Sequence, residues 1–159
     1  MTDTNVVQLI RPTEPLNQVR FKGSDKHSKY INILSKIAVA VEPVAQARIA
    51  SALVYRNDIV AVGINQRKSH PFQKIYGKNS EAIYLHSEVD CIKNALKHLS
   101  VDELSRSVLY VCRVKYEDQL KRKTIYGLAR PCPGCQRAIA AFNIRRVFYS
   151  LDYNGFDIL

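Results

Sequence analysis

Two short segments of the sequence carry residue types that could do chemistry together. The first is HSE at 86–88, and the second is PCPGC at 131–135. His86, Cys132 and Cys135 are one imidazole and two thiols, which are ligands that zinc prefers. Three protein ligands leave a fourth position open, as in a catalytic zinc site rather than in a closed structural one. The two segments therefore predict a catalytic zinc centre.

Glu88 gives this centre a predicted chemistry. It falls two positions after His86, close enough to reach a metal-bound water without being a ligand. Zinc lowers the pKa of such a water to about 7. A carboxylate beside it can take the proton and later deliver protons to a leaving amine. The spacing His-x-Glu followed by Pro-Cys-x-x-Cys is the signature of zinc-dependent hydrolytic deaminases of nucleobases.

The cysteines also have simpler interpretations. A Cys-x-x-Cys pair alone can be a redox motif, or part of a structural metal site to which His86 is incidental. We favour the catalytic centre, because His86-x-Glu88 and the cysteine pair both fall at predicted helix starts. Cys91 and Cys112 lie within apolar segments, and we expect them to pack in the core.

Hydrophobic periodicity predicts alternating helices and strands around these motifs. The predicted helices cover 26–42, 86–99 and 133–142, and the predicted strands cover 48–55, 59–64, 107–114 and 145–151. Residues 66–84 show no period, and a loop of this length in a compact domain is usually functional. We interpret 115–130 as an insertion.

This order of elements predicts a layered α/β domain. We expect a three-layer α/β/α architecture over residues 25–159, preceded by an irregular lead-in at 1–24. The central sheet should be mixed, with four to five strands and helices on both faces. Helix starts follow strand ends in such folds, where ligand sites gather. The predicted fold would therefore bring the two chemical segments together.

The net charge of +10, from 24 basic and 14 acidic residues, favours phosphorylated or polyanionic partners. Basic residues flank the expected mouth of the site: Arg56, Arg67, Lys68, Lys74, Lys78, Arg113, Lys115, Lys121, Arg122, Lys123 and Arg130. No stretch approaches the roughly 20 apolar residues that span a bilayer. The N-terminus lacks the pattern of a secretory signal, so we expect a reducing cytoplasmic location and no membrane partner.

The paired motifs HSE and PCPGC resemble the cytidine deaminase superfamily, and the resemblance covers roughly residues 26–150. Histidine as the first ligand is similar to the deoxycytidylate and nucleic-acid deaminase branches. The resemblance implies a cytidine-deaminase-like fold in which Glu88 shuttles protons while His86, Cys132 and Cys135 bind zinc. It also implies a homo-oligomer.

Four residues are expected to contact substrate. Gly63-Ile64-Asn65 resembles the Gly-x-Asn element whose asparagine contacts the sugar in this superfamily, and Tyr149 resembles an aromatic position of deoxycytidylate deaminases. Ser87 stands where the family often has alanine. His70 lies in the 66–84 loop, which could close over the zinc.

The predicted activity is that of a zinc hydrolase acting on the C–N bond of a cyclic amidine. We expect deoxycytidylate to be converted to deoxyuridylate, with zinc-bound hydroxide attacking C4 and Glu88 protonating N3 and then the departing ammonia. The alternative is a deaminase of cytosine or adenine within single-stranded DNA or RNA, which the basic charge favours. The 115–130 insertion and the short segment after the last predicted strand depart from the family pattern.

Overall fold

The computed structural model describes residues 25–44, 46–77, 84–120, 123–153 and 155–159. Its elements, in chain order, are α2 (Asp25–Val39), β1 (Arg48–Tyr55), β2 (Asp58–Ile64), α3 (Pro71–Tyr76), α4 (Ser87–Ala95), α5 (Val101–Ser105), β3 (Val108–Tyr116), β4 (Thr124–Gly127), α6 (Pro133–Ala141), β5 (Arg146–Ser150) and β6 (Phe156–Ile158). The predicted lead-in at 1–24 lies outside the described residues. Within the described ranges, no helix has the length and apolar character that a membrane crossing requires.

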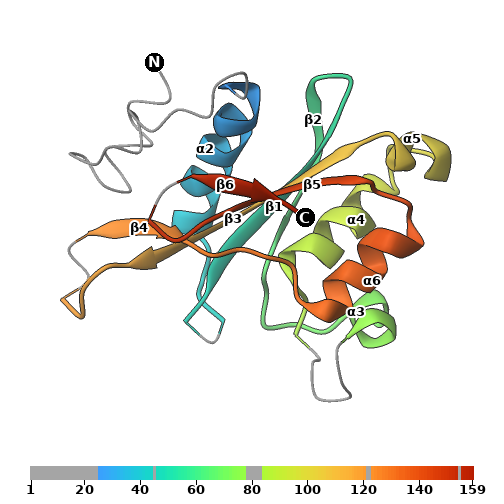
Figure 1. Cartoon of the computed structure of the whole chain (residues 1–159). Helices are drawn as coiled ribbons and strands as arrows, with labels where there is room; N and C mark the ends of the chain where they lie inside the picture. The colour runs from blue at the N-terminus through green and yellow to red at the C-terminus, as the bar shows by residue number, and fades with distance from the viewer. Residues whose placement is uncertain (1–24, 45, 78–83, 121–122, 154) are drawn as a thin grey trace.

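One mixed sheet forms the middle of the fold (Figure 1). The strand order is β2-β1-β3-β5-β6, and β4 pairs with the second half of β3. β3 and β5 run parallel, whereas the other pairs are antiparallel. The mixed sheet confirms the prediction, but it has six strands instead of four to five. The additional strands are β4 and β6, whose four and three residues are too short to show a period in the sequence.

Part of the predicted insertion at 115–130 is strand. β3 continues to Tyr116, and β4 returns antiparallel beside it. Ser150, at the end of β5, marks the point where β3 passes from one partner to the other. Its hydroxyl accepts a hydrogen bond from the Arg113 N–H at 3.0 Å and donates one to the Gly127 carbonyl at 2.7 Å. The extension is therefore joined to the central sheet through a buried side chain.

Helices cover both faces of the sheet, as predicted, so the fold has three layers (Figure 1). On one face, α2 places Tyr30, Leu34 and Ala38 against apolar side chains of β1, β3 and β5. On the other face, α4 and α6 pack over residues such as Leu53 and Leu109. Successive side chains of a strand point to opposite faces, so neighbouring residues of β1 and β3 serve the two cores alternately.

Tight local structure accounts for several element boundaries. The β1–β2 turn at Arg56 and Asn57 has φ values of 52° and 67°, which suit a two-residue hairpin of the primed type. In the 66–84 segment, where no element was predicted, His70 and Pro71 begin the short helix α3. The predicted helix at 86–99 ends at Ala95, and a separate helix, α5, starts after Ser100 with a complete capping box.

The start of α4 lies directly on β2, and Gly63 makes this contact possible. A Cβ atom at position 63 would lie 2.2 Å from the Ser87 carbonyl oxygen and 2.3 Å from the Cys91 nitrogen. Both are backbone atoms of α4, so they cannot move without shifting the helix. The absent side chain of Gly63 therefore fixes how close α4 sits to the sheet.

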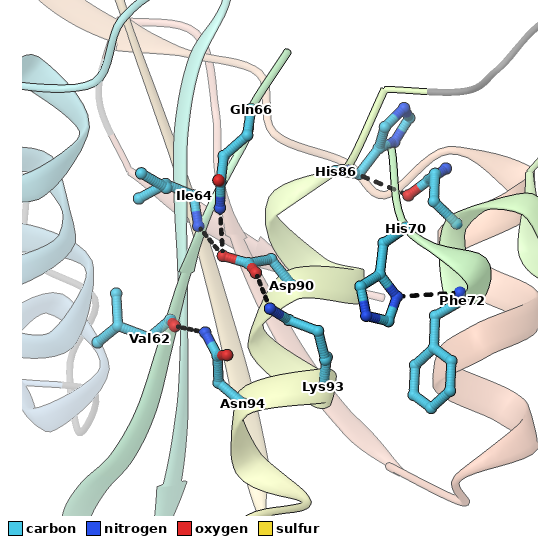
Figure 2. A network of polar contacts seen from close by, with 10 residues as sticks. Val62, Ile64, Gln66, His70, Phe72, His86, Asp90, Lys93 and Asn94 are labelled. Carbon is cyan, nitrogen blue, oxygen red and sulfur yellow. Dashed lines mark hydrogen bonds and ion pairs between the residues drawn. The ribbon is translucent and has the colours of Figure 1, made fainter. Parts of the chain in front are cut away.

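Polar side chains of α4 hold the same contact along the outer edge of β2 (Figure 2). Asp90 accepts hydrogen bonds from the Ile64 N–H and from the Gln66 side chain, both at 3.0 Å. Asn94 donates to the Val62 carbonyl at 2.8 Å. These bonds satisfy backbone groups of a strand that lies at one end of the sheet order. They also set the rotation of α4 about its axis.

Replacing Gly63 by Ala should destabilise the protein, because the added methyl group meets helix backbone rather than a mobile side chain. We expect a loss of about 1–3 kcal/mol in the free energy of unfolding, measured by urea denaturation. The matched control is Gly127→Ala, whose added Cβ meets the Arg113 side chain at 2.9 Å. That side chain can move aside, so the control should lose less. Equal losses in both variants would contradict the close-contact explanation.

Candidate metal centre and active site

The three predicted metal ligands come from the first residues of two helices. His86 is the N-cap of α4 and Cys132 the N-cap of α6, and both have extended backbone conformations. Neither side chain caps its own helix. Pro133, at the first position of α6, has no N–H that would need a partner. Both side chains are thus available to converge outside the helix ends.

They do converge. The Nδ1 atom of His86 lies 3.5 Å from the Sγ atom of Cys132 and 3.3 Å from that of Cys135. The ligand atoms of the three residues all lie within 4.8 Å of one another, and no other such group of three occurs among the described residues. Tetrahedral zinc, with bonds of about 2.0–2.3 Å, needs ligand atoms roughly 3.5–3.8 Å apart. The donor types and their spacing both fit zinc.

Glu88 lies beside this cluster in the first turn of α4. Its side chain is buried. Its Oε2 atom accepts a hydrogen bond from the Cys135 thiol at 3.5 Å and another from the Ser87 hydroxyl at 3.3 Å. Burial raises the pKa of the Glu88 carboxyl group, and the nearby His86 opposes this effect. Burial thus favours the protonated form of this carboxyl group more than water would.

The two clustered thiols differ in acidity without a metal. Hydrogen bonding from Cys135 lowers the pKa of Cys132, with a smaller contribution from His86. The same bond and burial raise the pKa of Cys135. Cys91 and Cys112 are buried in the two cores, as predicted, and burial raises the pKa of each. Among the four cysteines, only Cys132 therefore has a lowered pKa.

Ser87 and Asn65, both predicted to contact substrate, are bound to other protein groups. The Ser87 hydroxyl lies 2.7 Å from that of Ser51 on β1 and ties the start of α4 to the sheet. The Asn65 side chain accepts from the Ile49 N–H and donates to the Ala47 carbonyl, both at 2.9 Å. It thereby fixes the beginning of β1 beside the end of β2. Their contacts with substrate stay predictions.

Tyr149 and His70 also have protein partners. Tyr149 is buried on β5, and its hydroxyl accepts a hydrogen bond of 3.0 Å from Arg130, two residues before Cys132. His70 caps α3, and its Nδ1 atom accepts from the Phe72 N–H at 3.1 Å (Figure 2). Tyr149 is therefore linked to the segment that leads into the cysteine pair. A contact of either residue with substrate stays a prediction.

The predicted basic flank is only partly available to a ligand. Lys115 forms an ion pair of 2.8 Å with Asp152. Arg113 packs against Gly127 on the neighbouring strand, and its Nε atom is buried without a hydrogen-bond partner among the described residues. Lys78, Lys121 and Arg122 lie outside the described residues. The remaining exposed cations keep the surface basic.

Sequence reasoning missed three residues that form hydrogen bonds at the first turns of α4 or at its N-cap. Ser51 and Asp90 hold α4 against the sheet, and Gln73 accepts a hydrogen bond of 3.0 Å from the His86 N–H. Asp90 carried one usable signal, since an acidic residue in the first turn suits the helix dipole. Ser51 and Gln73 carried none, because their partners are distant in sequence and ordinary in type.

Comparisons with known proteins identify a family and a similar fold. The family model described as the cytidine and deoxycytidylate deaminase zinc-binding region matches residues 24–151. Among solved structures, the chain is similar to a dCMP deaminase from the cyanophage S-TIM5. The complex of that protein with dCMP and dUMP has 16% sequence identity and a TM-score of 0.51, and the match covers 83% of this chain and 85% of that one. Its apo form has 18% identity and a TM-score of 0.49, covering 82% and 86%. No match is found among curated proteins.

Replacing Cys132 or Cys135 by Ser should remove bound zinc, because a serine hydroxyl does not ionise to replace the thiolate. Metal analysis after dialysis should find about one zinc ion per chain in the original protein and close to none in either variant. Cys112→Ser, in the opposite core, is the control and should keep its zinc. A full zinc content in Cys135→Ser would place the metal elsewhere.

Proposed function

This chain belongs to the family of the cytidine and deoxycytidylate deaminase zinc-binding region and is a zinc-dependent deaminase; on that premise we propose that it deaminates a cytosine nucleotide, with deoxycytidylate as the substrate and deoxyuridylate as the product. The observation that carries the proposal is the convergence of His86, Cys132 and Cys135 with Glu88 buried beside them. This combines a three-ligand metal site with a proton carrier.

His86, Cys132 and Cys135 would hold the zinc ion. When bound, zinc supplies the Lewis acidity that makes water nucleophilic near neutral pH. In the overall reaction a C4–O bond forms and the C4–N bond to the amino group breaks, releasing ammonia. Glu88 would accept a proton from the attacking water and deliver it to N3 of the pyrimidine. Glu88 would then take the second proton of that water, from the oxygen now bonded to C4, and transfer it to the departing nitrogen.

The surroundings of Glu88 support this proton-carrying role. The side chain sits at the start of α4, where free N–H groups and the helix dipole favour negative charge. Burial acts in the opposite direction and raises its pKa. The Ser87 hydroxyl, itself held by Ser51, restrains one carboxylate oxygen. The carboxyl group is therefore held in place, and burial and the helix start act in opposite directions on its charge.

A mononucleotide substrate has a further line of support. Asn65 lies at the end of β2, beside the start of α4, and corresponds in type and position to the sugar-contacting residue that the family resemblance implies. One hydrogen of its side-chain amide is not used by the Ala47 contact and could bind a sugar hydroxyl. The exposed cations around this edge would suit a phosphate group.

The alternative substrate, a base within single-stranded DNA or RNA, rests on the net charge of +10. We also infer a cytoplasmic location, which is supported by four free cysteines. The homo-oligomer implied by the resemblance stays a prediction.

Replacing Glu88 by Gln should lower kcat for deamination by about 10²–10⁴-fold, because the amide cannot accept and donate the proton as the carboxyl group does. Zinc content should be unchanged, since Glu88 is not one of the proposed ligands. The control is Glu103→Gln in the α5 capping box, where glutamine can replace glutamate. Full activity in Glu88→Gln would refute the proposed mechanism.

A substrate panel tests the proposed substrate. Zinc-loaded protein would be assayed with cytidine, deoxycytidylate, its triphosphate, and single-stranded DNA and RNA oligomers, with products identified by mass. We expect turnover of deoxycytidylate with a mild dependence on salt. A polymer substrate would release many counterions on binding, so its affinity would fall steeply between 50 and 200 mM salt. Turnover of oligomers alone would replace the mononucleotide proposal by the alternative.

A further inference from the structure

The short helix α3 contacts both helices that carry the proposed zinc ligands, which also contact each other. Figure 1 shows α3 next to α6 and below α4, on the face of the sheet opposite α2. It belongs to a segment without any sequence motif for metal binding. Its contacts reach both ligand-bearing helices, and each contact is specific enough to be tested.

On the α4 side, the contact is a hydrogen bond to the backbone of a ligand residue. Gln73 is almost completely buried, with 1% of its surface exposed, although it is polar. Its Oε1 atom accepts a hydrogen bond of 3.0 Å from the His86 N–H. His86 is the N-cap of α4, so its N–H points away from the helical hydrogen-bond ladder and has no partner within the helix. Gln73 thus fixes the peptide group from which the His86 imidazole projects.

On the α6 side, the contact joins the other end of α3. The Arg137 guanidinium donates to the Tyr76 carbonyl at 3.1 Å and to the Gly77 carbonyl at 2.7 Å. These are carbonyls at the C-terminal end of α3, where a cation also suits the helix dipole. Arg137 lies two residues after Cys135 on α6. The aromatic rings of Phe72 and Tyr76 both lie near the Phe142 ring, at the end of α6.

These contacts form one connected path. It runs from His86 through Gln73 to α3, and from the end of α3 through Arg137 to the helix of Cys132 and Cys135. Metal affinity depends on the ligands being held at the correct separation before the metal arrives. We propose that α3 is a brace that sets this separation, with Gln73 and Arg137 as positioning residues for zinc binding. The inference rests on the proposed ligand set of His86, Cys132 and Cys135.

The two positioning residues act on different sides of the site. Loss of the Gln73 acceptor would release the His86 backbone and change the direction of its imidazole. Loss of Arg137 would remove the hydrogen bonds between α3 and α6 and leave only the aromatic ring contacts there, so Gln73 would be held less firmly relative to the cysteines. Either change should weaken zinc binding without removing a ligand. Because both lie on one path, losing the second link after the first should have little additional effect.

The test is zinc affinity in purified full-length protein, measured by competition with a chromogenic chelator. Gln73→Met removes the acceptor at similar volume, and Arg137→Met removes the guanidinium from an exposed position. We expect each variant to bind zinc about 10–100-fold more weakly. The double variant should be weaker by much less than the product of the two losses. Lys74→Met, an exposed substitution on α3 itself, is the control and should bind as the original protein does.

A second readout separates ligand positioning from general destabilisation. Cobalt can replace zinc, and its visible absorption reports the geometry of the ligands. Gln73→Met and Arg137→Met should change the shape of this spectrum at saturating cobalt, whereas loss of stability alone would not. Gln73→Glu, which keeps an acceptor oxygen, should restore at least part of the affinity and the original spectrum. If Gln73→Met does not fold, Arg137→Met decides by the same measurements.

The outcomes distinguish this inference from the proposed function. One outcome is that the original protein binds zinc while Gln73→Met and Arg137→Met keep its zinc affinity and cobalt spectrum. That result would refute the role of α3 as a brace and leave the proposed ligand set intact. If the free-energy losses in zinc binding of the two single variants add up in the double variant, Gln73 and Arg137 do not act through one path. A protein whose zinc binding is insensitive to Cys132→Ser and Cys135→Ser would refute the ligand set itself.

Discussion

The site depends on the close contact between β2 and the first turns of α4. Gly63 lets the backbone of α4 approach the sheet to a distance that any side chain would prevent. His86 and Glu88 are at the start of that helix, so the contact with the sheet fixes the position of this half of the site. Ser51 and Asp90 add bonds that keep the helix from sliding or rotating. A rigid scaffold of this kind suits chemistry that requires sub-ångström positioning.

The electrostatics of the site follow from the same geometry. Burial favours the neutral forms of Glu88 and Cys135, whereas His86 and the helix start favour the charged form of Glu88. A dication in the centre would tip this balance, because it favours thiolates. The proteins of the matching family bind zinc in this region. The metal and the protein are therefore complementary: the ion relieves the mutual repulsion of the groups that it gathers.

The chemistry could be predicted from the sequence because its residues are few, close in sequence and of unusual type. His86-x-Glu88 and the Cys132–Cys135 pair predicted the metal-ligand cluster and that its two segments come together in the fold. The alternation of helices and strands predicted the layers. β4, β6 and α3 could not be predicted, since three to six residues carry too little periodicity. Gln73 and Ser51 could not be predicted either, because they act through single bonds to partners that only the folded chain brings near. Asn65 was expected at the substrate, and the structure adds a role in fixing the start of β1.

The bonds from Asp90 and Asn94 to β2 have a consequence beyond the site. An edge strand with free N–H and carbonyl groups is a template on which another chain can add a strand, and it is a common starting point for aggregation. On this edge, the Ile64 N–H and the Val62 carbonyl already form hydrogen bonds with side chains of α4. The helix that presents His86 and Glu88 thus also covers two of the backbone groups through which another chain could pair with this edge. A substitution of Asp90 or Asn94 would therefore expose backbone groups of this edge as well as loosen the helix that carries the site.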